Sequence, residues 1–204
     1  MKKGLIVGLM VLMTMVAVPA VQAISLTDVT YYLTSDHCTG GCGTPPFGEV
    51  KLVQAAVDVN FTVTLYDGSK FVRTGSADFM NFKFNGTDVA LGDISGLGLT
   101  AATGDFDGDG TGDFAFGVYF TGQATGGGAG LPGPIMFTVG NASIADLTAP
   151  NSLGNIFVAD IISGQTGLTG PVDVTGVPVP EPATLLLLGS GLVGLWGARK
   201  KLKK

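Results

Sequence analysis

Four aspartates follow one another at short intervals in the stretch GDFDGDGTGDFAF. The first three alternate with other residues, Gly110 permits a sharp turn, and the fourth aspartate follows after a further four positions. Carboxylates at alternate positions of a turning loop converge on one point, and hard cations such as Ca²⁺ take oxygen ligands at about 2.4 Å. The sequence therefore predicts a structural calcium site whose ligands are Asp105, Asp107, Asp109, the carbonyl of Thr111, and Asp113.

This loop resembles the first nine positions of an EF-hand and the aspartate loops of dockerin and integrin-propeller repeats. Phe116 stands where an EF-hand has its bidentate glutamate, and a strand rather than a helix is expected to follow, which favours the propeller type. The alternative is a solvated acidic turn whose aspartates accept hydrogen bonds from their own backbone. Four carboxylates this close repel one another without a cation, which favours calcium.

A second cluster lies in the stretch DHCTGGCG, where Cys38 and Cys42 accompany His37, the single histidine of the chain. In an exported protein such a pair predicts a disulfide across the glycine-rich turn. A metal site with thiolate and imidazole ligands is an alternative, although it has at most three soft ligands. A free catalytic thiol is a further alternative.

The sequence contains few of the residue combinations that classical catalysis uses, and no catalytic residue is predicted. A serine-histidine-aspartate triad requires His37 as its base, and no nucleophile-elbow motif accompanies it. Aspartates are abundant enough for hydrolysis by paired carboxylates, but Glu49 is the one glutamate of the central region and nothing in the sequence marks a carboxylate for an elevated pKa. Sugar binding often uses exposed aromatic rings. Four tyrosines are candidates for that role, although packing is the simpler expectation for each: Tyr31, Tyr32, Tyr66 and Tyr119.

Short runs rich in Val, Thr, Phe and Tyr alternate with Gly, Asn and Asp turns through the central region. Residues 57–65 show a period of two, with Val57, Val59, Phe61, Val63 and Leu65 on one face. The pattern predicts an all-β fold, a single antiparallel β-sandwich that is jelly-roll-like and spans residues 24–162. The stretch TGQATGGGAGLPGP predicts a surface loop, and residues 163–182 predict a Gly/Pro-rich linker.

Both ends of the chain have the features of targeting segments. Two lysines, an apolar stretch and the tripeptide Val21-Gln22-Ala23 predict a signal peptide over residues 1–23, in preference to a retained membrane helix. Residues 183–198 carry no charge and predict a short transmembrane helix. Residues 199–204 form a basic tail that the positive-inside rule places in the cytoplasm. Its charged residues are Arg199, Lys200, Lys201, Lys203 and Lys204.

The central region is strongly acidic. Between Ile24 and Val177 fifteen acidic side chains stand against four basic ones, a formal charge of −11. Such a surface repels phosphate backbones, so nucleic acid is not expected as a partner.

Three prolines surround Glu181 in the stretch VPVPEPATLLLL, immediately before the apolar run. The tripeptide Pro180-Glu181-Pro182, the apolar helix and the basic ARKKLKK together resemble a PEP-CTERM sorting signal. In that family an exosortase, a membrane-embedded cysteine protease-like transpeptidase, reads the motif in bacteria that make exopolysaccharide. The resemblance implies processing by signal peptidase and exosortase, with an inner-membrane precursor and a mature form at the cell surface or in the extracellular matrix. The alternative is a permanent single-pass anchor on a proline-rich stalk.

These observations predict a non-enzymatic exported protein of the cell surface or extracellular matrix, associated with exopolysaccharide or biofilm. It is held in the membrane by its C-terminal helix until processing. One alternative is a calcium-dependent carbohydrate-binding module, and another is a hydrolase.

Overall fold

The computed structural model describes residues 28–75 and 79–175. The predicted signal peptide, transmembrane helix, basic tail and Pro180-Glu181-Pro182 motif all lie outside these residues. Among the residues described, none belongs to a helix with the length and apolar character needed to cross a membrane.

Five antiparallel strands form the smaller sheet, in the spatial order β1, β3, β4, β11, β7. Their bounds are β1 (Asp28–Leu33), β3 (Gly48–Ala55), β4 (Asp58–Leu65), β7 (Ile94–Ser95) and β11 (Ile135–Val139). β3 and β4 form a hairpin in register from Gly48↔Leu65 to Ala55↔Asp58. The two-residue β7 covers only one end of β11, through the pairs Thr138↔Ser95 and Val139↔Ile94.

Eight antiparallel strands form the larger sheet. Six follow the order β10, β5, β12, β6, β9, β8, while β13 pairs with β12 and the short β2 pairs with β13. Their bounds are β2 (Ser35–Asp36), β5 (Lys70–Arg73), β6 (Phe82–Phe84), β8 (Leu99–Asp107), β9 (Asp113–Phe120), β10 (Gly126–Leu131), β12 (Asn155–Ile162) and β13 (Thr169–Thr175). The described residues also include two short 3₁₀ helices, η1 (Leu91–Asp93) and η2 (Ala145–Leu147).

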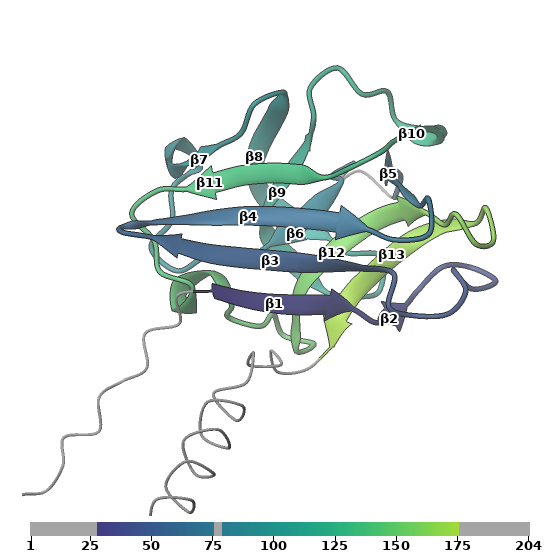
Figure 1. The fold of residues 1–204 in the computed structure, drawn as a ribbon, viewed down its shortest axis with the longest axis horizontal. Coiled ribbons are helices and arrows are strands. Elements are labelled where there is room, and N and C mark those ends of the chain that lie inside the picture. The colour runs from purple at the N-terminus through teal and green to yellow at the C-terminus, as the bar shows by residue number, and fades with distance from the viewer. Residues whose placement is uncertain (1–27, 76–78, 176–204) are drawn as a thin grey trace, which may run out of the picture.

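The two sheets enclose one hydrophobic core. Figure 1 shows β1, β3, β4 and β11 in front of β6, β9 and β12. β4 buries Val59, Phe61 and Val63 and leaves the intervening polar side chains on its other face, as a half-buried strand requires. Phenylalanines from both sheets meet in the middle of this core: Phe61, Phe82, Phe84, Phe137 and Phe157. The predicted all-β fold with two antiparallel sheets is confirmed, and its jelly-roll-like connectivity stays a prediction.

The predicted domain boundary at Ile162 is wrong. β13 lies within the segment expected to be a linker, and it pairs with β12 from Asn155↔Thr175 to Ile162↔Thr169. Val172 and Val174 are buried in the shared core, so this segment contributes apolar surface that a flexible linker would leave exposed. The folded region therefore extends to Thr175.

Two other expectations also differ from the structure. The glycine-rich stretch expected to be a loop contains β10, which pairs with β5 at Gly126↔Arg73 and Leu131↔Phe71. Val57, expected on the core face, lies between β3 and β4 with 65% of its surface exposed. The positive φ of 57° at Ala56 reverses the chain there, so the alternation begins only at Val59.

Candidate functional site

The four aspartates of the predicted calcium site lie on the β8–β9 hairpin. Asp107 and Asp113 are paired at the ends of the two strands, and Asp109 lies in the turn with a φ of 50°. The backbone N–H of Asp109 donates to Oδ1 of Asp107 at 2.9 Å, which is an Asx-turn. Thr111 is fully buried, and its carbonyl accepts hydrogen bonds from the side-chain amides of Asn151 and Asn155, each at 2.8 Å.

This arrangement does not assemble the predicted ligands around one point. Within residues 28–75 and 79–175, no three aspartates of the hairpin bring carboxylate oxygens within 4.8 Å of one another. The Thr111 carbonyl is also occupied by the two asparagine amides, which a cation would have to displace. The hairpin therefore has the geometry of an Asx-turn, and calcium binding stays a prediction that requires the loop to rearrange.

Cys38 and Cys42 are joined by a disulfide, as the sequence predicts. The carboxylate of Asp36 accepts hydrogen bonds from the backbone N–H groups of both cysteines, at 2.8 and 2.7 Å. Ser163 donates its hydroxyl to the Cys42 carbonyl at 2.6 Å, which ties the loop to the end of β12. Asp36 and the two cysteines do lie within 4.8 Å of one another, but sulfurs joined in a disulfide are not thiolate ligands.

Ser35, His37 and Asp173 come together beside this loop, because β2 pairs with β13 at Asp173↔Ser35. The Ser35 hydroxyl lies 3.0 Å from Nε2 of His37, and the same nitrogen lies 3.3 Å from Oδ2 of Asp173. A catalytic triad needs the serine and the carboxylate on opposite nitrogens of the imidazole. Both contacts here use Nε2, so this cluster does not form a relay.

The outer face of the smaller sheet carries rows of mostly polar side chains that the strand register aligns. Thr30, Lys51, Thr62 and Met136 form one such row across β1, β3, β4 and β11. A second row consists of Tyr32, Glu49 and Thr64, and a third of Asp28, Val53, Asn60, Thr138 and Ser95. Lys51 and Asp28 form an exposed ion pair at 3.2 Å. We call these three rows the outer sheet face.

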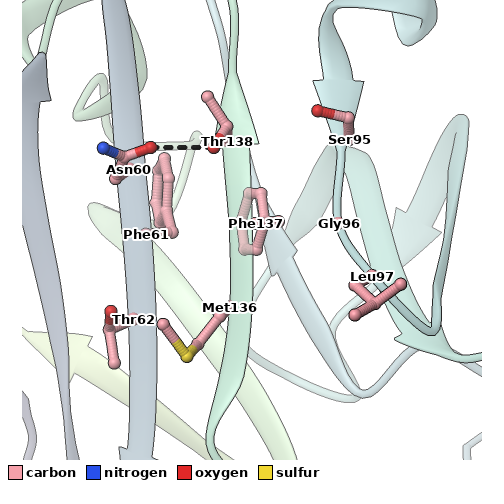
Figure 2. Close-up of a pocket in the computed structure, with 9 residues that line it drawn as sticks. All are labelled: Asn60, Phe61, Thr62, Ser95, Gly96, Leu97, Met136, Phe137 and Thr138. Carbon is pink, nitrogen blue, oxygen red and sulfur yellow. Dashed lines mark hydrogen bonds between the residues drawn. The ribbon is translucent and has the colours of Figure 1, made fainter.

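A shallow depression lies at the β11 side of the outer sheet face. Figure 2 shows Asn60 on β4 and Thr138 on β11 joined by a hydrogen bond, which is 2.7 Å long and donated by the threonine hydroxyl. Met136 and Leu97 also line this depression, and 58% and 103% of their surfaces are exposed. The depression exists because β7 ends at Ser95, so the chain no longer pairs with β11 beyond that residue.

A second depression lies where β4 ends, lined by Thr44, Pro45, Pro46, Leu65, Tyr66, Asp67, Gly164 and Gln165. Gln165 fixes its shape, because its amide accepts from the Thr44 N–H at 2.9 Å and donates to the Asp67 carboxylate at 2.9 Å. The Tyr66 hydroxyl donates to Glu49 at 2.8 Å. Burial, followed by this hydrogen bond and the charge of Glu49, raises the pKa of Tyr66.

Two of the four tyrosines pack against other side chains of the domain, and the other two lie at one end of the outer sheet face. Tyr31 is a core residue, packed edge-on against Phe157 at 5.3 Å, and burial raises its pKa. Tyr119 lies under the guanidinium of Arg73, 3.8 Å from the ring centroid. Tyr32 is 41% exposed and shares Glu49 as a neighbour with Tyr66. Tyr32 and Tyr66 therefore form an aromatic and carboxylate surface at one end of the outer sheet face.

The sequence pattern did not single out the outer sheet face as a site. The alternation in residues 58–65 already places Asn60, Thr62 and Thr64 on the solvent side of β4. It does not identify which strands lie beside them, because β11 follows about seventy positions later in the chain.

Residues 178–201 match the PEP-CTERM protein-sorting motif. The chain carries a PEP-CTERM sorting motif. The match covers the Pro180-Glu181-Pro182 tripeptide, the apolar run and the start of the basic cluster, so the predicted resemblance is confirmed. No curated protein and no solved structure matches the chain.

The PEP-CTERM motif implies an exported protein that an exosortase processes at the membrane and that reaches the cell surface. The described fold ends at Thr175, three positions before the first residue of the match. The β13 strand therefore connects the two-sheet domain almost directly to its sorting motif.

Proposed function

We propose that this chain is a non-enzymatic protein of the cell surface or extracellular matrix, delivered through its PEP-CTERM motif, whose outer sheet face contacts exopolysaccharide. The motif at residues 178–201 is the observation that carries the surface assignment. The cluster closest to a catalytic set among the described residues, Ser35, His37 and Asp173, lacks relay geometry, which supports a non-enzymatic role.

The chemistry of the outer sheet face supports a hydroxyl-rich partner. Tyr32 on this face and Tyr66 in the adjoining depression at the end of β4 offer aromatic surface with polar tips, and Glu49 and Asp67 offer carboxylate acceptors for sugar hydroxyls. The excess of acidic side chains in the exported region repels acidic polymers. The partner proposed here is therefore a polysaccharide without acidic groups.

Replacing the motif glutamate tests the sorting step. We expect Glu181→Ala to abolish processing, because it removes the one charged group between the prolines of the motif while leaving the apolar run intact. Unprocessed chain should accumulate in the inner membrane, as measured by immunoblotting of membrane and surface fractions. Val179→Ala, which leaves the tripeptide unchanged, is the matched control. Normal surface delivery of Glu181→Ala would refute the sorting assignment.

Retention on polysaccharide tests the outer sheet face. We expect Tyr32→Ala to weaken retention on the producing bacterium's isolated exopolysaccharide about two- to tenfold, since an aromatic stacking contact contributes roughly 0.5–1.5 kcal/mol. Affinity electrophoresis through gels that contain the polymer measures the change. Val57→Ala, at an exposed position outside the three rows, should be retarded by the polymer as strongly as the parent chain.

The same gels separate this proposal from the calcium-dependent alternative. Retention through Tyr32 and Tyr66 should persist in EGTA, whereas retention through the β8–β9 hairpin should require calcium and should be lost in Asp107→Asn. Retention that is unchanged by Tyr32→Ala but lost in EGTA would indicate that the polysaccharide contacts the β8–β9 hairpin instead of the outer sheet face.

A further inference from the structure

β8 is the outermost strand of the larger sheet, with β9 on one side and no described strand on the other (Figure 1). Its backbone groups alternate between these two sides, as in any antiparallel pair. The Thr121 N–H donates to the Gly98 carbonyl at 2.9 Å, which makes this pair a hydrogen-bonded one. By alternation, the even-numbered residues at the start of β8 bond to β9, whereas Ala101 and Thr103 direct their N–H and C=O groups to the open side.

The neighbouring strand gives the same assignment from its other side. Val118 of β9 is paired with Ala101, and its carbonyl accepts the N–H of Asn81 at 3.0 Å, on the side away from β8. The two residues of such a pair point their backbone groups in opposite directions, so those of Ala101 face outward. Within residues 28–75 and 79–175, no hydrogen bond reaches the N–H or C=O groups of Ala101 and Thr103 on this side. The open edge therefore carries four unpaired backbone groups.

This edge has none of the features by which sheet edges usually avoid pairing. Residues 99–103 read LTAAT, with no charged residue and no proline, and the register shift of β8 begins only after Thr103. Charged side chains, proline and bulges are the common protections of an edge strand. Leu99 and Ala101 pack against the core but are only partly buried. The edge can therefore accept a further strand, which would also cover these two apolar side chains.

A second copy of β8 fits this edge because the segment is complementary to itself. In an antiparallel arrangement centred on Ala102, Ala101 of each copy lies opposite Thr103 of the other. Each pair of this kind exchanges two N–H to C=O hydrogen bonds. The two pairs make four bonds, which satisfy all four open groups of each copy. The methyl group of Ala102 is small enough for the copies to meet at the centre, where opposite Cα atoms lie about 4.5 Å apart.

Charge selects this orientation. The region between Ile24 and Val177 has a formal charge of −11, so two copies repel one another over most of their surface. Asp105 is the first charged residue after the LTAAT segment. Antiparallel pairing sends the Asp105 residues of the two copies to opposite ends, about 20 Å apart, whereas parallel pairing would place them on neighbouring strands about 5 Å apart. An uncharged edge that keeps its aspartates apart favours a second copy in the antiparallel orientation.

We propose that two copies of the exported domain associate edge to edge through residues 99–103 of β8 and so form one continuous antiparallel sheet. The two-fold axis of such a pair is perpendicular to the sheet, because residues directly opposite one another point to the same face. The outer sheet faces of both copies then point to the same side. Two contact faces are thereby offered to one polysaccharide, which raises retention through effective concentration. This consequence rests on the proposed function, whereas the association itself does not.

Sedimentation equilibrium of the full chain in density-matched detergent measures the association without polysaccharide. We expect a monomer–dimer equilibrium, and Ala102→Asp should raise its dissociation constant at least tenfold because two carboxylates then lie directly opposite one another. Ala102→Lys should have the same effect, and an equal mixture of the two variants should associate at least as tightly as the parent chain. Val57→Asp, at an exposed turn of the smaller sheet, adds the same charge and is the matched control, with a dissociation constant within threefold of the parent's.

Two further measurements identify the edge itself and do not depend on charged variants. The amides of Ala101 and Thr103 should gain at least tenfold protection from hydrogen exchange between dilute and concentrated samples, whereas those of Thr100 and Ala102 should be protected in both. Ala102→Cys should form an intermolecular disulfide at least ten times faster than Val57→Cys, because the expected Cα separation lies within the disulfide range.

Absence of association at every concentration would overturn the proposal. So would association that Ala102→Asp leaves unchanged, because the contact would then lie elsewhere, for example in the apolar C-terminal run. Equal exchange of the Ala101 and Thr103 amides in dilute and concentrated samples would also exclude pairing through β8.

Discussion

Phe61→Ala should lower the free energy of unfolding by about 3–5 kcal/mol, the usual cost of removing a buried aromatic ring. The ring is 1% exposed and is stacked on Phe137, with centroids 4.5 Å apart and an interplanar angle of 11°. It also contacts Phe84 and Phe157 from the opposite sheet, at 5.4 and 5.8 Å. These neighbours belong to both sheets. None of them can fill the space left by the ring unless its own strand shifts within its sheet. Urea unfolding of the full chain in detergent, followed by tyrosine fluorescence, measures the change.

The neighbouring residue on β4 is the matched control. Thr62→Ala changes the outer sheet face, where the side chain is only half-buried, and should cost less than about 1 kcal/mol. A Phe61→Leu variant should lie between the two, since it retains part of the apolar volume. If Phe61→Ala and Thr62→Ala had similar effects, the assignment of the two faces of β4 would be incorrect.

The position of Phe61 could be predicted from the sequence because alternation is a local property of a strand. In residues 58–65 the apolar and polar side chains take turns, and the structure buries them accordingly. β13 was missed because Gly170 and Pro171 mark a linker by composition, while only Val172 and Val174 mark a strand. Burial of those two valines against β12 depends on residues that the local pattern does not contain.

The candidate sites show the same limit. The disulfide could be predicted because its two cysteines are four positions apart. The hairpin aspartates were expected to converge on an ion together with the Thr111 carbonyl. That carbonyl instead accepts hydrogen bonds from Asn151 and Asn155, which lie forty or more positions later in the chain. The contact of His37 with Asp173 spans an even longer separation, and it exists only because β2 pairs with a strand that the sequence did not predict.

Asp160→Asn should remove a pH dependence of stability that the parent chain shows between about pH 4 and pH 6. Burial, partly offset by hydrogen bonds from Thr74 and by the charge of Lys83, raises the pKa of Asp160 from 3.8 to about 6. Oδ2 accepts from the Thr74 N–H and hydroxyl at 2.7 and 2.5 Å, whereas Oδ1 has no partner among the described residues. The folded chain therefore retains a proton that the unfolded chain releases.

The sign of the effect follows from this difference. Below about pH 4 both states are protonated and the favourable contribution is fully present, and it is lost as pH rises through about 6, where the folded state ionises. A displacement of about two pKa units corresponds to about 3 kcal/mol. An asparagine stays neutral throughout, so the free energy of unfolding of Asp160→Asn, measured in urea at a series of pH values, should lack this decline.

Asp146→Asn is the control of opposite sign, because hydrogen bonds from Ser143 lower the pKa of Asp146, and its contribution is lost as pH falls. Parallel pH profiles for the parent chain and Asp160→Asn would show that ionising the Asp160 carboxyl does not destabilise the folded state. The surroundings of Asp160 on β12 would then be more open to water than its burial indicates.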